Sequence, residues 1–149
     1  MSVQVTVQRA FRGKTPSDLL LTRWATRAVG DFRKRAALTL RIVGITEGAN
    51  LNTTWRHKMG ATNVLSFPAV GLESLMPEFL GDMVICAPLV GREAKAQAKA
   101  LDAHWAHLTI HGVLHLLGFD HVTPAPTKTM ETLERRLLAG LGYPDPYHQ

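Results

Sequence analysis

The sequence predicts an α+β domain with one mixed sheet. Segments with the period-two alternation of strands are followed by segments with helical spacing, in the order strand, helix, strand, helix, strand, strand, and then helices to the end. The 149 residues, 46% of them hydrophobic, fall within the usual span of one domain, and no repeat or long linker divides them. We therefore expect a single domain over residues 1–149, with a sheet of roughly four strands packed with about five helices.

The N-terminal part of the chain supplies the first three elements. Valines at positions 3, 5 and 7 alternate with polar residues, which predicts a half-buried strand within residues 1–11. Pro-Ser-Asp at 16–18 has the chemistry of a helix start, and an apolar stripe at helical spacing continues over residues 19–32. Apolar residues then alternate with their neighbours, so residues 37–45 are expected to form a second strand.

The middle of the chain continues with a short helix and two strands. The helix is expected over residues 46–58, and a strand over residues 63–68 ends at its proline, which cannot donate to a sheet ladder. Residues 69–80 have no clear period and contain both glycine and proline, so we expect a loop able to border a cleft. The apolar run 81–87 again predicts a strand.

The C-terminal part is predicted to be helical. The helical pattern from Pro88 to Gly118 has a proline suited to a first turn, and we expect a break near residues 101–104 that divides it into two helices. A last helix is expected over roughly residues 127–141.

Charge is distributed unevenly along the chain. Residues 1–60 hold 11 Lys and Arg against 3 Asp and Glu, whereas the remainder holds 6 against 9, so the two parts carry +8 and −3. A basic surface attracts polyanions and speeds their encounter. Nucleic acid is therefore the natural class of partner, although many basic proteins simply have solvated Lys and Arg faces.

Nothing in the sequence predicts export or membrane insertion. The first eleven residues lack the apolar stretch of a signal peptide, and no run approaches the ~18 consecutive apolar residues that a membrane helix needs. Cys86, the single cysteine, has no partner for an internal disulfide and lies in an apolar stretch, where we expect a buried thiol. We therefore expect a soluble, cytoplasmic protein with no membrane partner.

Five of the seven histidines lie between residues 104 and 121, inside the most hydrophobic stretch of the chain. His111 and His115 are four apart on an expected helix, so their imidazoles project from one face, one turn apart. Gly118 can take the left-handed conformation that ends a helix and turns the chain back, which would deliver His121 to the same ion. The spacing HxxxHxxGxxH therefore predicts three metal ligands and an open fourth position, as in catalytic zinc sites.

A metal explains these histidines better than core packing does. Three imidazoles in apolar surroundings would each need a polar partner, at roughly 1–3 kcal/mol per unsatisfied group, and one divalent cation satisfies all three. We expect one Zn²⁺ per chain, because neutral imidazoles beside an open position suit zinc, with nickel or iron as alternatives. His107 lies roughly 11–12 Å along the helix from His115. We therefore assign His107 and His104 to packing, to a hydrogen bond with a ligand, or to a wall of the cleft.

The residue after the first ligand histidine excludes one metal-dependent mechanism. In H-E-x-x-H metalloproteases this residue is a glutamate that serves as general base, whereas here it is Gly112, which has no side chain to accept a proton. Peptide hydrolysis by that route is ruled out. Glycine inside a helix costs up to about 1 kcal/mol relative to alanine, and a packing contact, a close backbone or a bulky substrate would each explain its presence.

Four further residues are candidates for the site. Arg56 could face the cleft and hold a phosphate with its planar fork of donors, or could be an exposed surface arginine. Asp120 and Asp82 could each orient a ligand histidine, and Asp82 could also move protons, although capping a turn is the commoner fate of aspartate. Ser66 has no nucleophile elbow around it, so we expect its hydroxyl to bond to the backbone.

These segments together resemble a known family. HGVLHLLGFDH at 111–121, with LNTTWR at 51–56, TNVLSFP at 62–68 and GDMVIC at 81–86, is similar to the YbeY family of bacterial endoribonucleases, also called rRNA maturation factors. The resemblance covers essentially the whole chain, with four motifs in the right order. Two positions depart mildly, since Asn63 stands where many members have aspartate and Phe119 where many have tyrosine.

The resemblance implies a zincin-like α+β fold, zinc on His111, His115 and His121, and a functional arginine at Arg56. It implies a zinc-dependent endoribonuclease, specific for single strands, that acts in maturation of the 3′ end of 16S rRNA and in ribosome quality control. The implied partners are single-stranded RNA and the small ribosomal subunit with its assembly factors, and no DNA partner is expected.

The expected chemistry is metal-assisted cleavage of RNA. Zinc would polarise a phosphate oxygen or lower the pKa of its water toward roughly 7, with His115 and Arg56 as the catalytic residues and Arg56 on the phosphate. The sequence does not identify the general base. Two alternatives remain: a ribosome-assembly or RNA-binding factor with a structural zinc, and a metal-dependent hydrolase of another bond, against which Gly112 argues.

Overall fold

The computed structural model of the chain describes residues 2–119 and 124–147, and only the backbone at Asp31 and residues 124–127. Within these residues the strands are β1 (Ser2–Arg9), β2 (Arg35–Val43), β3 (Val64–Pro68) and β4 (Phe79–Cys86). The helices are α1 (Asp18–Val29), α2 (Ile45–Arg56), α3 (Ala87–Ala96), α4 (Leu101–Leu116) and α5 (Pro124–Gly140), with a 3-10 turn at Gly30–Phe32. The predicted element order and the α+β class are confirmed.

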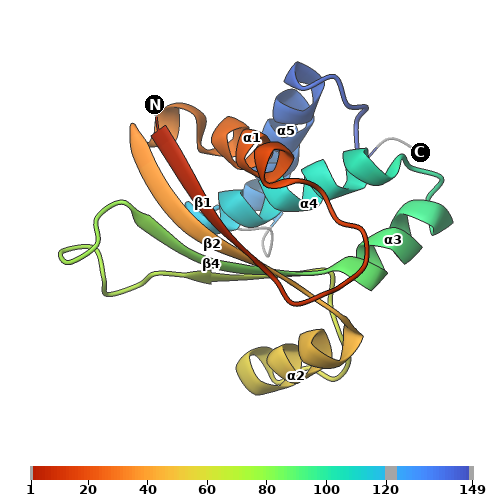
Figure 1. The fold of residues 1–149 in the computed structure, drawn as a ribbon. Helices are drawn as coiled ribbons and strands as arrows, with labels where there is room; N and C mark the ends of the chain where they lie inside the picture. Colours follow the sequence, from red (N-terminus) through yellow and green to blue (C-terminus); the bar gives the residue numbers. More distant parts are fainter. Residues whose placement is uncertain (1, 120–123, 148–149) are drawn as a thin grey trace.

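The sheet is mixed and has the strand order β1-β2-β4-β3. β1, β2 and β4 run parallel, whereas β3 runs antiparallel to β4 and forms one edge. Helices α1, α4 and α5 lie over one face of the sheet, and α2 lies on the other (Figure 1). α4 also contacts the edge strand β3, and Arg56 at the end of α2 reaches the same strand through a hydrogen bond to Ser66 O.

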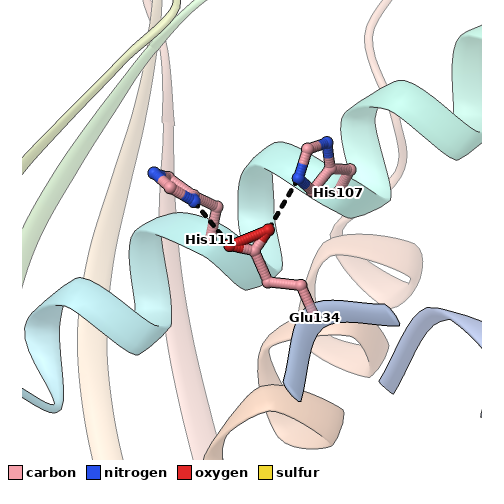
Figure 2. Close-up of side chains that lie close together, drawn as sticks. All are labelled: His107, His111 and Glu134. Carbon is pink, nitrogen blue, oxygen red and sulfur yellow. Dashed lines mark hydrogen bonds and ion pairs between the residues drawn. The ribbon is translucent and has the colours of Figure 1, made fainter. Parts of the chain in front are cut away.

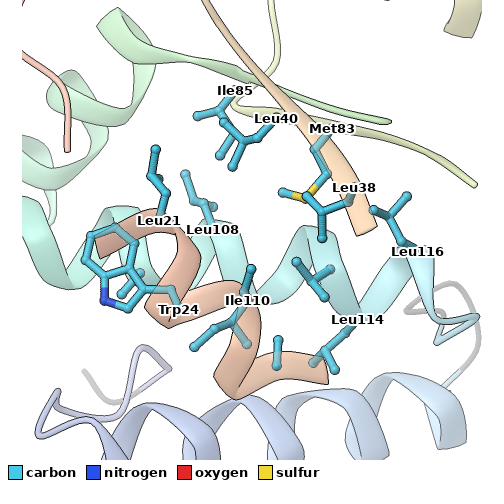
Figure 3. Packing of buried hydrophobic residues seen from close by; sticks show 14 of the residues in the cluster. Leu21, Trp24, Leu38, Leu40, Met83, Ile85, Leu108, Ile110, Leu114 and Leu116 are labelled. Atoms are coloured by element: carbon cyan, nitrogen blue, oxygen red, sulfur yellow. The ribbon is translucent and has the colours of Figure 1, made fainter. Parts of the chain in front are cut away.

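The hydrophobic core lies between the sheet and the helices α1 and α4. Leu38 and Leu40 from β2 and Met83 and Ile85 from β4 are at most 1% exposed, because alternate residues of these strands face the helices. Figure 3 shows them opposite side chains of α1 and α4, among which are Leu21, Trp24, Leu108, Ile110, Leu114 and Leu116. Fully burying a side chain of this size contributes about 1.5–3 kcal/mol, so α4 is fixed firmly against the sheet.

Most predicted boundaries agree with the structure to within a few residues. Ser17 caps α1 by accepting a hydrogen bond from the backbone N–H of Leu20 at 3.2 Å, as the helix-start chemistry predicts. The break between α3 and α4 is the clearest difference, because it lies at residues 97–100 rather than at 101–104. Ala98 has a positive φ of 52° there, and no glycine or proline marks the turn in the sequence.

Two smaller predictions have clear outcomes. Cys86 is 1% exposed and packs with Val43, Leu65 and Val84, so the expected buried thiol is confirmed, and burial raises the pKa of this thiol. The loop between β3 and β4 does not border the cleft described below, because none of residues 69–78 is among those that line it. No helix in the described part of the chain combines the length and the apolar character that crossing a membrane would require.

Candidate metal centre

The histidines of α4 form a row along one side of the helix. His104, His107, His111 and His115 follow at spacings of three or four residues, which places each ring about one turn from the next. The ring centroids of successive pairs are 6.3, 6.1 and 4.7 Å apart. His111 and His115, which the spacing predicts to share one face, therefore belong to a longer row of four histidines.

Gly118 ends this helix as the sequence predicts. Its φ is 104°, in the region that favours glycine. The backbone N–H of Gly118 bonds to His115 O, and that of Phe119 bonds to Leu114 O, each at 3.0 Å. This is the Schellman arrangement, which turns the chain back beside the last turn. His121 and Asp120, which follow, lie outside the described residues.

His111 and His115 point their Nε2 atoms at each other. The two nitrogens are 3.2 Å apart. Two imidazole ligands on one tetrahedral zinc, each about 2.0–2.1 Å from the ion, would be separated by about 3.3–3.4 Å. The observed spacing therefore fits a pair of ligands to one ion without a change of rotamer.

A buried carboxylate from α5 holds two histidines of the row. Glu134 is 0% exposed, and its Oε1 lies 2.8 Å from His111 Nδ1 while its Oε2 lies 2.8 Å from His107 Nε2 (Figure 2). The hydroxyl of Tyr147 also donates to Oε2 at 2.6 Å. Burial by itself raises the pKa of Glu134, but the hydrogen bonds from His107, His111 and Tyr147 outweigh it and lower the pKa to about 2.

The charge of Glu134 decides the tautomers of the two rings. Because the carboxylate is ionised, it accepts hydrogen bonds, so His111 carries its proton on Nδ1 and His107 carries its proton on Nε2. With its proton on Nδ1, His111 presents Nε2 toward His115, and a bare Nε2 is the form of the ring that binds a metal. A carboxylate behind a ligand histidine is a common arrangement in zinc proteins and raises the basicity of the ring.

His107, His111 and Glu134 also form a group of their own. Their ligand atoms lie within 4.8 Å of one another, so this group could hold a metal ion. The distances of 2.8 Å between Glu134 and each ring are hydrogen-bond lengths, which are shorter than the about 3.3 Å expected between two ligands of one tetrahedral ion. The structure thus assigns His107 a hydrogen bond to the carboxylate that holds His111.

Glu134 is the functional residue that sequence reasoning missed. α5 buries the stripe Met130, Glu134, Leu137 and Leu138, which has the spacing of an apolar helix face. A glutamate in that stripe is a buried charge that needs partners. A glutamate within the apolar stripe of α5 could therefore have been recognised from the sequence as a buried charge, but the stripe does not show that its partners are histidines of α4.

Arg56 lies in the same cleft as the facing histidines. The cleft has a volume of about 690 Å³ and runs along the edge strand β3. Arg56, Lys58, Ser66, His111 and His115 are among the residues that line it. The guanidinium of Arg56 donates to Ser66 O at 2.6 Å and lies over the ring of Phe67 at 5.5 Å, so two contacts from β3 orient the arginine.

Gly112 lets α4 approach the sheet closely. A Cβ at this position would overlap with Met83 Cε and would lie 3.2 Å from Ser66 Oγ. Ser66 uses its hydroxyl to donate to Gly112 O at 3.1 Å, which confirms the predicted bond to the backbone. Gly112 is therefore a packing glycine, and it sets the distance between the histidine helix and the floor of the cleft.

The remaining candidates are placed as follows. Asp82 is exposed on β4 and alternates with the core residue Met83, so it faces the side of the sheet away from α4 and does not line the cleft. Among the described residues, the carboxylate that contacts a predicted metal ligand is Glu134. Asn63 lines the cleft and donates through its amide to Glu93, which also contacts His104 Nε2 at 2.8 Å. The amide of Asn63 can donate a hydrogen bond to the carboxylate of Glu93, which an ionised aspartate at this position could not do.

Together, the α+β fold, the facing imidazoles and the arginine-lined cleft define a candidate metal-dependent hydrolase. The family model described as Endoribonuclease YbeY matches residues 15–142. The chain is 53% identical over 146 residues to Endoribonuclease YbeY of Stutzerimonas stutzeri, a match that covers 97% of this chain and 91% of that protein. A protein with the same name from Pseudomonas putida is 52% identical over 146 residues, covering 97% and 93%. The chain therefore belongs to the YbeY family.

A solved structure supports the same fold. The solution structure of TM1509 from Thermotoga maritima superimposes with a TM-score of 0.59 over 99% of each chain, at 18% sequence identity. The arrangement of strands and helices is thus retained where most side chains differ.

Proposed function

We propose that this chain is a metal-dependent endoribonuclease that cleaves single-stranded RNA in the cleft along β3. The observation that carries the proposal is the facing pair His111 and His115, which lines the same cleft as Arg56. The matched relatives are named as endoribonucleases, and this supports RNA as the substrate. We further propose a cytoplasmic role in maturation of the 3′ end of 16S rRNA and in ribosome quality control, on the small subunit.

The proposed metal is zinc, held by His111, His115 and His121. The spacing of the first two Nε2 atoms fits the ion, and the turn at Gly118 ends α4 three residues after His115. When bound, zinc supplies Lewis-acid chemistry, in which it polarises a phosphate oxygen or makes water more acidic. The buried carboxylate of Glu134 keeps His111 in the tautomer and orientation that such a ligand needs.

Arg56 is proposed to hold the phosphate that is cleaved. Its guanidinium is positioned by Ser66 O and the Phe67 ring, and its remaining N–H donors are free to form a fork with phosphate oxygens. Charge grows on those oxygens during cleavage, so an arginine aimed at them stabilises the transition state more than the bound substrate. Arg56 therefore stabilises the transition state of cleavage in addition to attracting the RNA backbone.

Two substitutions test this function together. We expect His115→Ala to lower both the metal content and the cleavage of a defined single-stranded RNA, because a ligand is removed. We expect Arg56→Ala to keep its metal but to lose about 100- to 1000-fold in cleavage rate, the scale of one transition-state donor. Metal content by elemental analysis and initial cleavage rates, both on highly purified protein, measure these effects.

Arg23→Ala provides the matched control for charge, because Arg23 is exposed on α1 and does not line the cleft. It should leave metal content and cleavage unchanged. Unchanged cleavage in both His115→Ala and Arg56→Ala would overturn the proposed mechanism. If the two variants also supported ribosome maturation as well as the unmodified protein, an assembly factor with a structural metal would be the better assignment.

A further inference from the structure

Trp55 is exposed, whereas the other two tryptophans of the chain are buried. Trp24 is 1% exposed and Trp105 is 2% exposed, both within the core, while Trp55 is 63% exposed at the end of α2. An indole left in water forgoes a large hydrophobic contribution, and tryptophan is enriched at surfaces that bind a partner. The exposure of Trp55 therefore needs an explanation that the fold does not supply.

The indole of Trp55 is oriented by its neighbours. Its ring packs edge-to-face with that of Phe67, with centroids 6.3 Å apart and planes at 70°. Phe67 also lies under the guanidinium of Arg56. One phenylalanine of β3 thus contacts both the exposed indole and the arginine of the cleft, which holds the two side chains in a defined relation.

The segment after Trp55 is fastened to α2 and is basic. Asn52 Nδ2 donates to Gly60 O at 2.8 Å, and Thr53 Oγ1 donates to Lys58 O at 3.2 Å, so Lys58 is presented by an ordered turn. Between residues 50 and 70 the chain contains Arg56 and Lys58 but no aspartate or glutamate. The rim beside Trp55 is therefore suited to a polyanion.

We propose that Trp55 stacks on a base of single-stranded RNA whose backbone Arg56 and Lys58 hold in the cleft. This inference rests on the proposed function and adds to it a base-binding residue on the rim. Every base offers a π face, so the contact tolerates many sequences. A base within a duplex is already stacked on both sides, so the contact selects single strands.

The three tryptophans make the contact directly measurable. The probe is a fluorescently end-labelled oligouridine with 2′-O-methyl groups, which resists cleavage, and the protein is kept metal-free with a chelator. An unlabelled copy of the probe should quench the emission of Trp55, because this indole is exposed and the other two are buried. Anisotropy of the labelled probe gives the Kd independently of the emission.

Two variants at this position and one control separate stacking from other effects. Trp55→Ala should weaken binding by roughly 5- to 150-fold, the range of one base–aromatic stack, and should abolish the quenching. Trp55→Phe should abolish the quenching but retain most of the affinity, because the ring still stacks. Leu19→Ala removes a side chain that is 80% exposed on α1 and should change neither.

The outcomes distinguish this inference from the proposed function. An oligomer with the bases removed should bind the unmodified protein and Trp55→Ala equally. If Trp55→Ala binds oligouridine as tightly as the unmodified protein, or if duplex RNA quenches Trp55 as strongly as the single strand, the stacking inference is wrong and a protein partner becomes the better explanation of the exposed indole. If oligouridine binds and quenches as described but the metal-loaded protein cleaves no RNA, the stacking inference holds and the proposed nuclease function is wrong.

Discussion

The two walls of the cleft are held in place by different means. On the α4 wall, His111 is fixed from behind by Glu134, which is fully buried and accepts three hydrogen bonds. On the α2 wall, Arg56 is exposed and is held by a backbone carbonyl and by the ring of Phe67, which also contacts the exposed indole of Trp55 beside the cleft. One wall is set by buried charge and the other by contacts at the surface.

This difference suits the two tasks proposed above for the walls. A metal ligand must keep one rotamer and one tautomer, and a buried carboxylate enforces both because an unpaired partner would cost free energy. A wall that holds RNA must bind many different RNA sequences. Exposed side chains with few fixed contacts suit this task because they can adjust to each sequence. We therefore expect substitutions behind the α4 wall to change the metal and the fold, and substitutions on the α2 wall to change substrate binding.

The largest effect is expected at Glu134. In Glu134→Gln the amide cannot accept equally from two ring N–H groups and Tyr147, and its NH₂ would face a donor. We expect zinc affinity to fall by about 10- to 100-fold, the usual effect of losing the group behind a ligand histidine. Competition with a zinc-binding dye measures this affinity. Glu131→Gln is the control, because Glu131 lies on the same helix and pairs at the surface with Arg135 at 3.8 Å. Equal zinc affinity in the two variants would contradict the role given to Glu134.

A smaller effect on stability is expected from Gly112→Ala. The added methyl group overlaps with buried Met83, and overpacking of this kind costs about 1–3 kcal/mol, from which a helix-propensity gain of up to about 1 kcal/mol is subtracted. Gly91→Ala is the matched control in the interior of α3, where a Cβ would have no atom within 4 Å, so it should stabilise the protein by about 0.5–1 kcal/mol. Urea unfolding gives both values, and two changes of the same sign would refute the close-packing account.

The smallest effect concerns pH and the far end of the histidine row. Burial lowers the pKa of His104, against the opposing influence of Glu93 from α3, while His107 and Lys99 add to the lowering. The unfolded chain therefore binds a proton near the ordinary pKa of 6.5, and the folded chain binds it at lower pH. The stabilising contribution is complete above pH 6.5 and is lost as the pH falls through the pKa of folded His104.

Urea unfolding at pH 7.5 and pH 5.5, about one unit on each side of that ordinary pKa, tests the effect in chelator-treated protein. The unmodified protein should lose more free energy of unfolding on acidification than His104→Gln, which keeps a donor for Glu93 but does not titrate. Equal losses would show that His104 has no part in the pH dependence.

Helix periodicity and capping rules predicted the structure correctly where both partners of an interaction are close in the sequence. The helix spacing of His111 and His115, the cap at Ser17 and the turn at Gly118 each depend on residues within about five positions, so periodicity and capping chemistry predict them. The same rules misplaced the helix break, which lies at residues 97–100, because Ala98 has a positive φ there that is unusual for alanine. They also left the role of Asp82 open, since proximity to a motif does not show which face of the sheet a side chain takes.

The sequence by itself determined the spacing of His111 and His115, the α+β class and the absence of the metalloprotease glutamate. Tertiary structure alone decided that Glu134 and Tyr147 from the C-terminal part hold His107 and His111, and that Arg56 reaches the edge strand beside them. The physical reason is separation along the chain: spacing within one helix follows from its period, whereas a contact between α4 and α5 or between α2 and β3 depends on how whole elements pack.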